Sequence, residues 1–311
     1  MINVSVVMIT YNHDLYIKEA ILGILSQISN YEIELIIADD CSTDKTESVV
    51  REIINTHPKC DQIKYTRHAT NKGMMPNFIW ALEQSKGQYI ALCEGDDYWT
   101  DPYKLQKQII FFENHPDSNY VFTNISKLKP DGTFEESAYT LPELFDLHFL
   151  LKENIMPSTQ TVVFRNSALT NLSKWKPTLT AGFNGDWILL FMITENSKIG
   201  FLSDNTAVYR EGVGVISKTK SYFKFINGLN INKRIDKLTH FKYSYHIGHY
   251  GWHYENITYS SFEENLYLKG FYWLLITILY KIKTTGIVGV FSRNRNFFKH
   301  VIKLIFKRID I

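Results

Sequence analysis

The sequence predicts an α/β protein with a mostly parallel central sheet, helices on both sheet faces, and a C-terminal helical, basic extension. Two observations carry this prediction. Over residues 1–115, short apolar runs alternate with longer amphipathic segments, which is typical of a parallel sheet covered by helices. Charge then divides the chain, because residues 1–218 hold 19 Lys and Arg against 27 Asp and Glu (net −8), whereas residues 219–311 hold 15 against 5 (net +10).

We place a domain boundary at residue 218, where the composition becomes aromatic, basic and helical. Residues 1–218 form one predicted domain with halves at 1–115 and 116–218, and residues 219–311 form the extension. The 311 residues are 45% hydrophobic and 21% charged, which excludes a disordered or collagen-like chain. Three cysteines without Cys-x-x-Cys spacing argue against a disulfide framework and a zinc site, and fit a reducing compartment. The first twelve residues lack the features of a signal peptide.

The elements of the first half follow from the periodicity of apolar residues. The expected strands are residues 4–9, 33–38, 63–66 and 89–93, and the expected helices are residues 15–27, 45–56, 76–86 and 102–113. Pro76 and Pro102 lie where a first helical turn tolerates proline, and Asp44 and Asp101 are plausible helix caps.

The second half has a more mixed pattern. It predicts strands at 120–126, 161–165 and 207–210, a turn at 129–132 and a helix at 186–196. Neither half carries Gly-x-Gly-x-x-Gly or Gly-x-x-x-x-Gly-Lys-Ser/Thr, which removes the usual dinucleotide and P-loop interpretations.

Acidic residues follow two of the expected strands. Asp39 and Asp40 end the second strand, and Glu94, Asp96 and Asp97 follow the fourth. In a parallel sheet both groups fall on one edge, where ligands bind and where like charges repel unless a cation or hydrogen-bond donors intervene. Carboxylate oxygens suit Mg²⁺ or Mn²⁺. Such residues also form ordinary turns and caps, an interpretation that is weaker for the second group than for isolated residues.

In order and spacing, four segments resemble the inverting glycosyltransferases of family 2 with the GT-A fold. They are Val6–Asn12 (VVMITYN), Ile36–Asp44 (IIADDCSTD), Asn71–Gly73 (NKG) and Glu94–Trp99 (EGDDYW), and the match spans about residues 1–218. Each motif is weak alone, but together they are specific.

The resemblance implies a nucleotide-sugar donor, with uridine as the default base. It implies that Thr10, Tyr11 and Asn12 line the base pocket and that Asp39 accepts a hydrogen bond from the base. Asn71, Lys72 and Gly73 would form the loop beside the nucleotide, and Asp96 would face the ribose.

The resemblance also implies a divalent metal, Mn²⁺ or Mg²⁺, that Asp97 ligates and that bridges the diphosphate. Glu94 stands where the family more often has Asp. Asp186 in Gly185-Asp186-Trp187 corresponds to the catalytic base, although an acid at a helix start also serves as a cap. Gly212 stands where the family often has a histidine after Tyr-Arg, so an imidazole contact to the diphosphate is not expected there. Arg210 could assist the site or form a buried ion pair.

The extension predicts a membrane-surface segment at residues 271–309. Its apolar run at 271–280 is shorter than the roughly 20 residues that span a bilayer. On a helical projection Phe298, Val301, Ile302, Ile305 and Ile309 share one face, with Lys299, Lys303 and Lys307 opposite, a pattern typical of helices on anionic membranes. The alternative is a helix that packs its apolar face on the protein.

The sequence thus predicts a cytoplasmic enzyme on the inner face of the cell membrane. It would move a sugar to a glycan or lipid-linked acceptor in bacterial surface-polysaccharide or lipo-oligosaccharide synthesis, and nucleic acid is not an expected partner. Two alternatives stay open. One is a nucleotidyltransferase, which lacks its expected Gly-rich loop here; the other is a non-catalytic glycan- or nucleotide-binding subunit.

Overall fold

A computed structural model describes residues 2–244, 250–293 and 295–306. The chain folds into two compact units, Met1–Lys218 and Thr219–Ile311. The first unit contains the sheet, and the second is helical in its described residues.

The first half of the sheet is parallel. Its strands run in the order β3-β2-β1-β4, with bounds β1 (Val4–Thr10), β2 (Ile33–Asp39), β3 (Ile63–Arg67) and β4 (Tyr89–Leu92). Nearly every residue of β1, β2 and β4 is buried, as expected for strands covered on both faces. The register pairs Thr10 with Asp39, so β1 and β2 end at the same edge.

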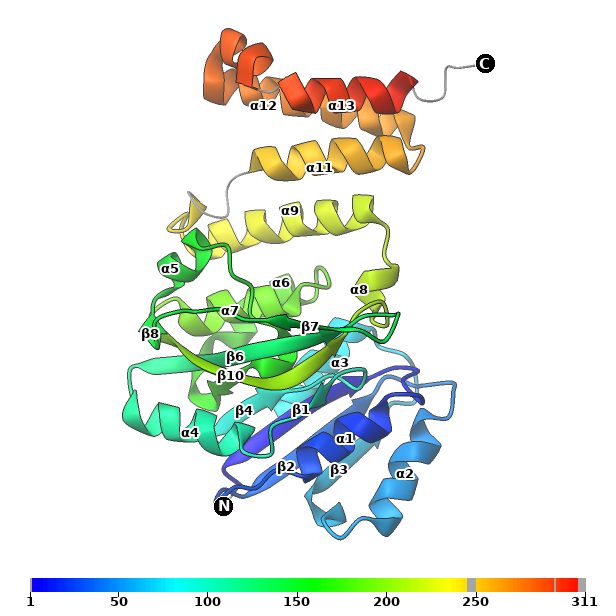
Figure 1. Ribbon diagram of the computed structural model, residues 1–311, viewed down its shortest axis with the longest axis vertical. Coiled ribbons are helices and arrows are strands. Elements are labelled where there is room, and N and C mark those ends of the chain that lie inside the picture. Colours follow the sequence, from blue (N-terminus) through cyan, green and yellow to red (C-terminus); the bar gives the residue numbers. More distant parts are fainter. Residues whose placement is uncertain (1, 245–249, 294, 307–311) are drawn as a thin grey trace. The chain divides into compact units, whose positions relative to one another are not determined.

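Helices cover this half of the sheet (Figure 1). They are α1 (Ile17–Leu25), α2 (Thr46–Thr56), α3 (Met74–Gln84) and α4 (Lys104–Asn114). Alternate residues of β1, Val4, Val6 and Met8, join α1, α2 and α4 in one buried core. Helix α3 packs on β1 and β2. Successive strand residues face opposite sides, so both faces of the sheet are used for packing.

The second half of the first unit continues the sheet in the order β9-β6-β10-β5. Strands β6 and β10 are parallel to each other, and β9 is antiparallel to both β4 and β6. The predicted α/β fold with a mostly parallel sheet is confirmed. The remaining elements are β5 (Tyr98–Trp99), β6 (Ser118–Leu128), β7 (Phe134–Ser137), β8 (Leu144–Phe145), α5 (Leu147–Lys152), β9 (Val163–Arg165), α6 (Leu172–Leu179), α7 (Gly185–Thr194), β10 (Lys198–Arg210) and α8 (Val215–Lys218).

One strand is longer than the sequence predicted. The segment expected as a strand at 207–210 is the end of β10, which has 13 residues. Its first part contains Gly200, Asp204 and Asn205, residue types that are depleted in strands, but pairing with β6 overrides their propensity. Two register shifts in that ladder lie next to Asn205. Strands β5, β7 and β8 and helices α5 and α6 were also not predicted.

The described part of the second unit consists of α9 (Ser221–Leu238), α11 (Tyr250–Glu263), α12 (Tyr267–Arg293) and α13 (Arg295–Phe306). Helix α11 packs on the other three. Tyr222, Leu229 and Ile257 form one small core, and Phe262, Phe297 and Val301 form another. Within the described residues, no helix has both the length and the apolarity needed to cross a membrane.

Helix α13 carries part of the segment expected at a membrane surface. Val301 is buried, and Phe298 packs against the core that Phe262 and Phe297 form. Ile302 is exposed, whereas Ile309 and Lys307 lie outside the described residues. Two residues of the expected membrane face, Phe298 and Val301, therefore take part in internal packing with Phe262 and Phe297.

Candidate active site

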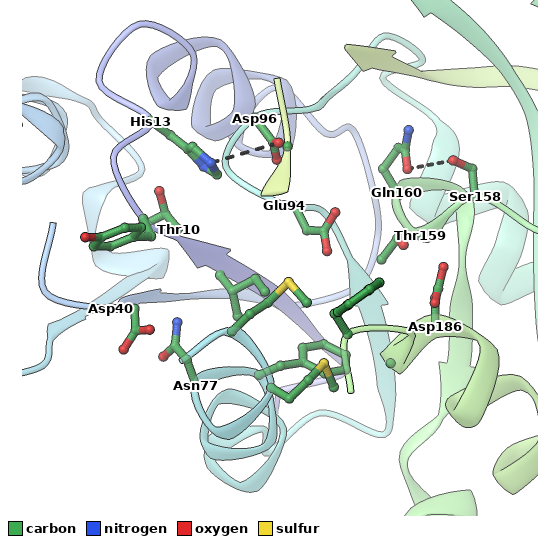
Figure 2. Close-up of a pocket in the computed structure, with 18 of the residues that line it drawn as sticks. Thr10, His13, Asp40, Asn77, Glu94, Asp96, Ser158, Thr159, Gln160 and Asp186 are labelled. Atoms are coloured by element: carbon green, nitrogen blue, oxygen red, sulfur yellow. Dashed lines mark hydrogen bonds and ion pairs between the residues drawn. The ribbon is translucent and has the colours of Figure 1, made fainter. Parts of the chain in front are cut away.

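A pocket of about 480 Å³ opens at the carboxyl ends of β1, β2 and β4. This is the edge at which open α/β sheets bind ligands, and the volume suits a small-molecule site. Both halves of the first unit contribute to the pocket (Figure 2). Its polar lining includes Thr10, Tyr11, His13, Asp40, Asn71, Glu94, Asp96, Gln160 and Asp186.

Three carboxylates gather in the turn after β4. One ligand oxygen from each of Glu94, Asp96 and Asp97 lies within 4.8 Å of the others. Gly95 lets this turn approach β1, because a Cβ atom there would lie 2.8 Å from Thr10 Oγ1. Three hard oxygen ligands at this spacing fit a Mg²⁺ or Mn²⁺ ion.

Burial makes the charged forms of these acids unfavourable. It raises the pKa of Glu94 to about 8, with further contributions from the negative charges of Asp96 and Asp186. Burial, followed by repulsion from Asp96 and Glu94, also raises the pKa of Asp97 well above its usual value. The group therefore favours either bound protons or a cation that compensates its charge.

Arg210 supports the acidic turn. Its backbone N–H donates to Asp97 Oδ1 at 2.8 Å, and its Nη1 donates to the carbonyl of Asp96 at 2.6 Å. The guanidinium also forms an ion pair with Glu19 and lies 4.4 Å from the ring centroid of Tyr98. Arg210 is buried and does not line the pocket. Of its two expected roles, the buried ion pair matches this arrangement.

The end of β2 has a different electrostatic environment. Asp39 is fully buried, where its Oδ1 accepts from Ser42 N at 2.8 Å and its Oδ2 accepts from the Tyr65 hydroxyl at 2.7 Å. It is not among the pocket-lining residues, whereas the neighbouring Asp40 is. Asp40 accepts from the backbone N–H groups of Lys72 and Gly73 at 2.6 and 2.9 Å. It thus holds the Asn71–Gly73 loop against the strand.

The other residues expected around the nucleotide also divide into two groups. Thr10, Tyr11 and Asn71 line the pocket. Asn12 does not: it has a left-handed backbone (φ 57°), and its Oδ1 accepts from Thr43 N at 2.8 Å. The Lys72 ammonium lies 5.7 Å from the ring centroid of Trp80, outside the pocket lining. Asn12 and Lys72 therefore shape neighbouring loops in this structure.

Asp186 lies in the first turn of α7 and lines the pocket. Its Oδ1 accepts from the Trp187 N–H at 2.8 Å. Burial raises its pKa, which brings the carboxylate closer to the proton affinity that suits a base near neutral pH. In Figure 2, Asp186, Thr159 and Gln160 lie on one side of Glu94, and Thr10, His13 and Asp96 lie on the other.

His13 and Gln160 are among the pocket residues that sequence reasoning missed. His13 Nε2 lies 3.9 Å from Asp96 Oδ2, and burial lowers the His13 pKa. Gln160 is buried, and its Oε1 accepts from Ser158 Oγ at 3.0 Å. Among the described residues, His13 Nδ1, Gln160 Nε2 and Thr10 Oγ1 are buried without a hydrogen-bond partner. The sequence offered one clue to His13, which directly follows the Thr10–Asn12 motif. It offered no clue to Gln160.

Fold and site together define a GT-A type α/β protein with an acidic ligand pocket. The family model for glycosyl transferase family 2 matches residues 5–172, more than half of the chain, and the chain belongs to this family.

The chain is also similar to curated proteins, one of which is named as a glycosyltransferase. The chain is 30% identical over 191 residues to the putative teichuronic acid biosynthesis glycosyltransferase TuaG of Bacillus subtilis, covering 58% of this chain and 73% of TuaG. It is 33% identical over 208 residues to the uncharacterized protein Rv1520 of Mycobacterium tuberculosis, covering 66% of this chain. The matched region spans only 58% of the length of that mycobacterial relative.

Solved structures share the fold at low sequence identity. S. aureus TarS 1-349 in complex with UDP-GlcNAc matches with a TM-score of 0.62 at 16% identity, covering 99% of this chain and 92% of the other. The mannosyltransferase PcManGT of Pyrobaculum calidifontis, in complex with GDP-Man and Mn²⁺, matches with a TM-score of 0.55 at 16% identity, covering 97% and 85%.

Proposed function

We propose that the protein is an inverting, metal-dependent glycosyltransferase that moves a sugar from a nucleoside diphosphate sugar to an acceptor hydroxyl. The observation that supports this most is the cluster of Glu94, Asp96 and Asp97, whose ligand oxygens lie within 4.8 Å of one another. Glu94 and Asp96 line the pocket, whereas Asp97 is buried and is not among the lining residues. The family assignment supports sugar transfer as the reaction.

The proposed donor is a uridine diphosphate sugar. TarS has been solved with UDP-GlcNAc and with UDP, which supports this base for a chain of the same fold. We assign Thr10, Tyr11 and Asn71 to direct contact with the nucleotide, since all three line the pocket. Asp96 is assigned to the ribose. Asn12 and Lys72 would act by shaping their loops. Asp39 would accept a hydrogen bond from the base only after the turn at Ser42 moves.

The proposed metal ligands are Asp97 and Glu94. A bound Mn²⁺ or Mg²⁺ would neutralise the negative charge that develops on the leaving diphosphate. The Arg210 N–H donates to Asp97 Oδ1, and the half-buried Glu94 lies beside Asp97, which supports this assignment.

The proposed base is Asp186. An acceptor hydroxyl is a poor nucleophile at neutral pH, so a carboxylate within hydrogen-bond reach would take its proton as the new bond to the anomeric carbon forms. One such displacement inverts the anomeric centre. Figure 2 supports this division of labour, because Asp186 lies beyond Glu94 from the Thr10 side of the pocket, where the nucleotide is assigned.

The proposed acceptor is a growing glycan or a lipid-linked glycan of the bacterial cell surface. The name of TuaG, a putative teichuronic acid biosynthesis glycosyltransferase, supports this class. We place the reaction on the cytoplasmic side of the cell membrane, with the extension at an anionic lipid surface. Cys41, Cys60 and Cys93 form no disulfide in the structure, and a reducing compartment is part of this proposal.

A thermal-shift screen of nucleotide sugars, with and without Mn²⁺, tests the proposal, because a ligand stabilises the native state according to its affinity and concentration. We expect one nucleotide sugar to raise the melting temperature only with metal, and the same compound to be hydrolysed or transferred. Binding without turnover would indicate a non-catalytic subunit, and release of pyrophosphate from a nucleoside triphosphate and a sugar phosphate would indicate a nucleotidyltransferase.

A further inference from the structure

Helix α12 presents a continuous apolar stripe to solvent. Six large side chains on it are 36–89% exposed: Leu268, Phe271, Tyr272, Leu275, Leu279 and Ile282. At about 100° per residue, their positions fall within about 100° of arc around the helix and extend for about 21 Å along it. None of the six is charged, and the stripe is as broad as the apolar face with which an amphipathic helix normally packs.

The opposite side of α12 is packed inside the second unit. Thr277 is fully buried and forms a hydrogen bond with Thr258 of α11, and Lys281 is buried in an ion pair with Glu255. Trp273 stacks on Tyr254 with ring centroids 5.8 Å apart. The helix is therefore anchored to α11 through one face, and the stripe is the face that this packing leaves exposed.

The charge of the second unit indicates what covers the stripe. Residues 219–311 hold 15 Lys and Arg against 5 Asp and Glu. Lys269 and Lys283 are exposed directly beside the ends of the stripe. Exposed basic residues around a broad apolar face are typical of helices that lie in the headgroup region of anionic membranes. A second copy of this unit is a poorer occupant, because self-association through the stripe would bring two strongly positive surfaces together.

We propose that the stripe on α12, and not the apolar side of α13, is the surface with which the protein binds an anionic lipid bilayer. This inference rests on the proposed function, which places the extension at an anionic lipid surface, and it assigns that contact to one helix face. The stripe lies in the bilayer surface, with its apolar side chains among the acyl chains and the flanking lysines beside the headgroups. The helix does not span the bilayer.

Flotation of the full chain with lipid vesicles tests this surface. We expect the protein to bind vesicles of about 30% phosphatidylglycerol in phosphatidylcholine and to bind pure phosphatidylcholine much more weakly, because basic residues near the surface favour anionic lipid. The double variant Leu275→Ser/Leu279→Ser should bind the anionic vesicles at least about tenfold more weakly, because it loses two leucine side chains that the bilayer would bury. Leu268→Ser, at the most exposed position, should give a smaller loss.

The matched control is Ile28→Ser/Phe134→Ser, which removes two side chains of similar exposure from the first unit. It should bind vesicles as the unmodified protein does. Far-UV circular dichroism checks that each variant is folded.

Three results would overturn the inference: no vesicle binding by the unmodified protein, equal binding by the stripe variant, or equal loss in the control. If light scattering shows a dimer that the stripe variant dissolves without loss of vesicle binding, the stripe is a subunit interface instead. Nucleotide-sugar binding is measured on the same samples, so that failure of the lipid surface and failure of the proposed reaction are told apart.

Discussion

The two acidic strand ends of the first unit have similar sequences but different environments. After β2, Asp39 and Asp40 accept four hydrogen bonds from within the protein, two each. After β4, Glu94, Asp96 and Asp97 lie within 4.8 Å of one another, and burial with mutual repulsion raises the pKa values of Glu94 and Asp97. Hydrogen-bond donors of the chain compensate the negative charge at the end of β2. At the end of β4, Arg210 compensates only part of the negative charge.

This difference separates the acids that stabilise the structure around the pocket from the acids that are candidates for binding a ligand. A carboxylate whose oxygens already have donors contributes to stability, and removing it leaves those donors unsatisfied. Clustered carboxylates with raised pKa values are candidates for function, because holding them together costs free energy unless something binds. Substitutions at the two ends should therefore affect different measurements.

The largest effect on activity is expected for Asp186→Asn, a substitution in the same pocket as the acidic turn after β4. Loss of the proton acceptor should lower kcat for transfer by about 10²- to 10⁴-fold, because general-base assistance contributes on this scale. Affinity for the nucleotide should stay unchanged, as measured by isothermal titration calorimetry. Near-normal turnover would assign Asp186 to the start of α7 as a structural residue.

The next effect is expected for Asp97→Asn. Metal-dependent nucleotide binding should weaken by roughly 10²-fold, since a charged ligand that contributes a few kcal/mol is replaced by a neutral one. The matched control is Asp40→Asn at the compensated end, which should keep the response to Mn²⁺. Equal metal dependence in Asp97→Asn and the unmodified protein would refute the ligand assignment.

A smaller effect, on stability, is expected for Asp40→Ala. The Lys72 N–H loses its acceptor, and the Gly73 N–H keeps only Asn71 Oδ1, which should lower the free energy of unfolding by about 1–3 kcal/mol. Denaturant titration in the presence of EDTA measures this change. Were Asp40→Ala as stable as the unmodified protein, the contrast between the two strand ends would lose its basis.

The last effect, measured as a shift in melting temperature, is the pH dependence of the metal-free protein. The folded-state pKa of Glu94, about 8, is above its usual 4.5, so the folded state binds more protons than the unfolded state between these values. Stability should therefore fall as pH rises from about 5 to 8. With EDTA, the melting temperature should fall by a few degrees more in the unmodified protein than in Glu94→Gln. Identical profiles for the two proteins would argue against the raised pKa.

Several site residues could be predicted because the sequence marks where strands end. The apolar runs of β1, β2 and β4 fix the positions of Thr10, Asp39 and the Glu94–Asp97 turn, and a parallel sheet brings those ends to one edge. Which of two adjacent acids enters the pocket could not be predicted. Asp39 is hydrogen-bonded to Tyr65, whereas Asp40 lines the pocket. The way the chain turns after β2 decides this, and the spacing of residues in the sequence does not encode that turn.

The extension shows the same limit. The sequence predicted a membrane surface over residues 271–309, which includes parts of both α12 and α13, and left packing on the protein as the alternative. In the structure, Phe298 and Val301 of α13 pack with Phe262 and Phe297, whereas the α12 stripe is exposed, and apolar periodicity does not distinguish these two outcomes.

Apolar periodicity and local motifs were enough to establish the class of fold, the family and the position of the acidic residues along the chain, because these are short-range properties. They could not show that Gln160 and Asp186 share a pocket with Glu94, that Arg210 supports the acidic turn, or which helix exposes apolar residues. These outcomes depend on contacts between residues far apart in the chain. Such contacts are fixed only when the whole core packs.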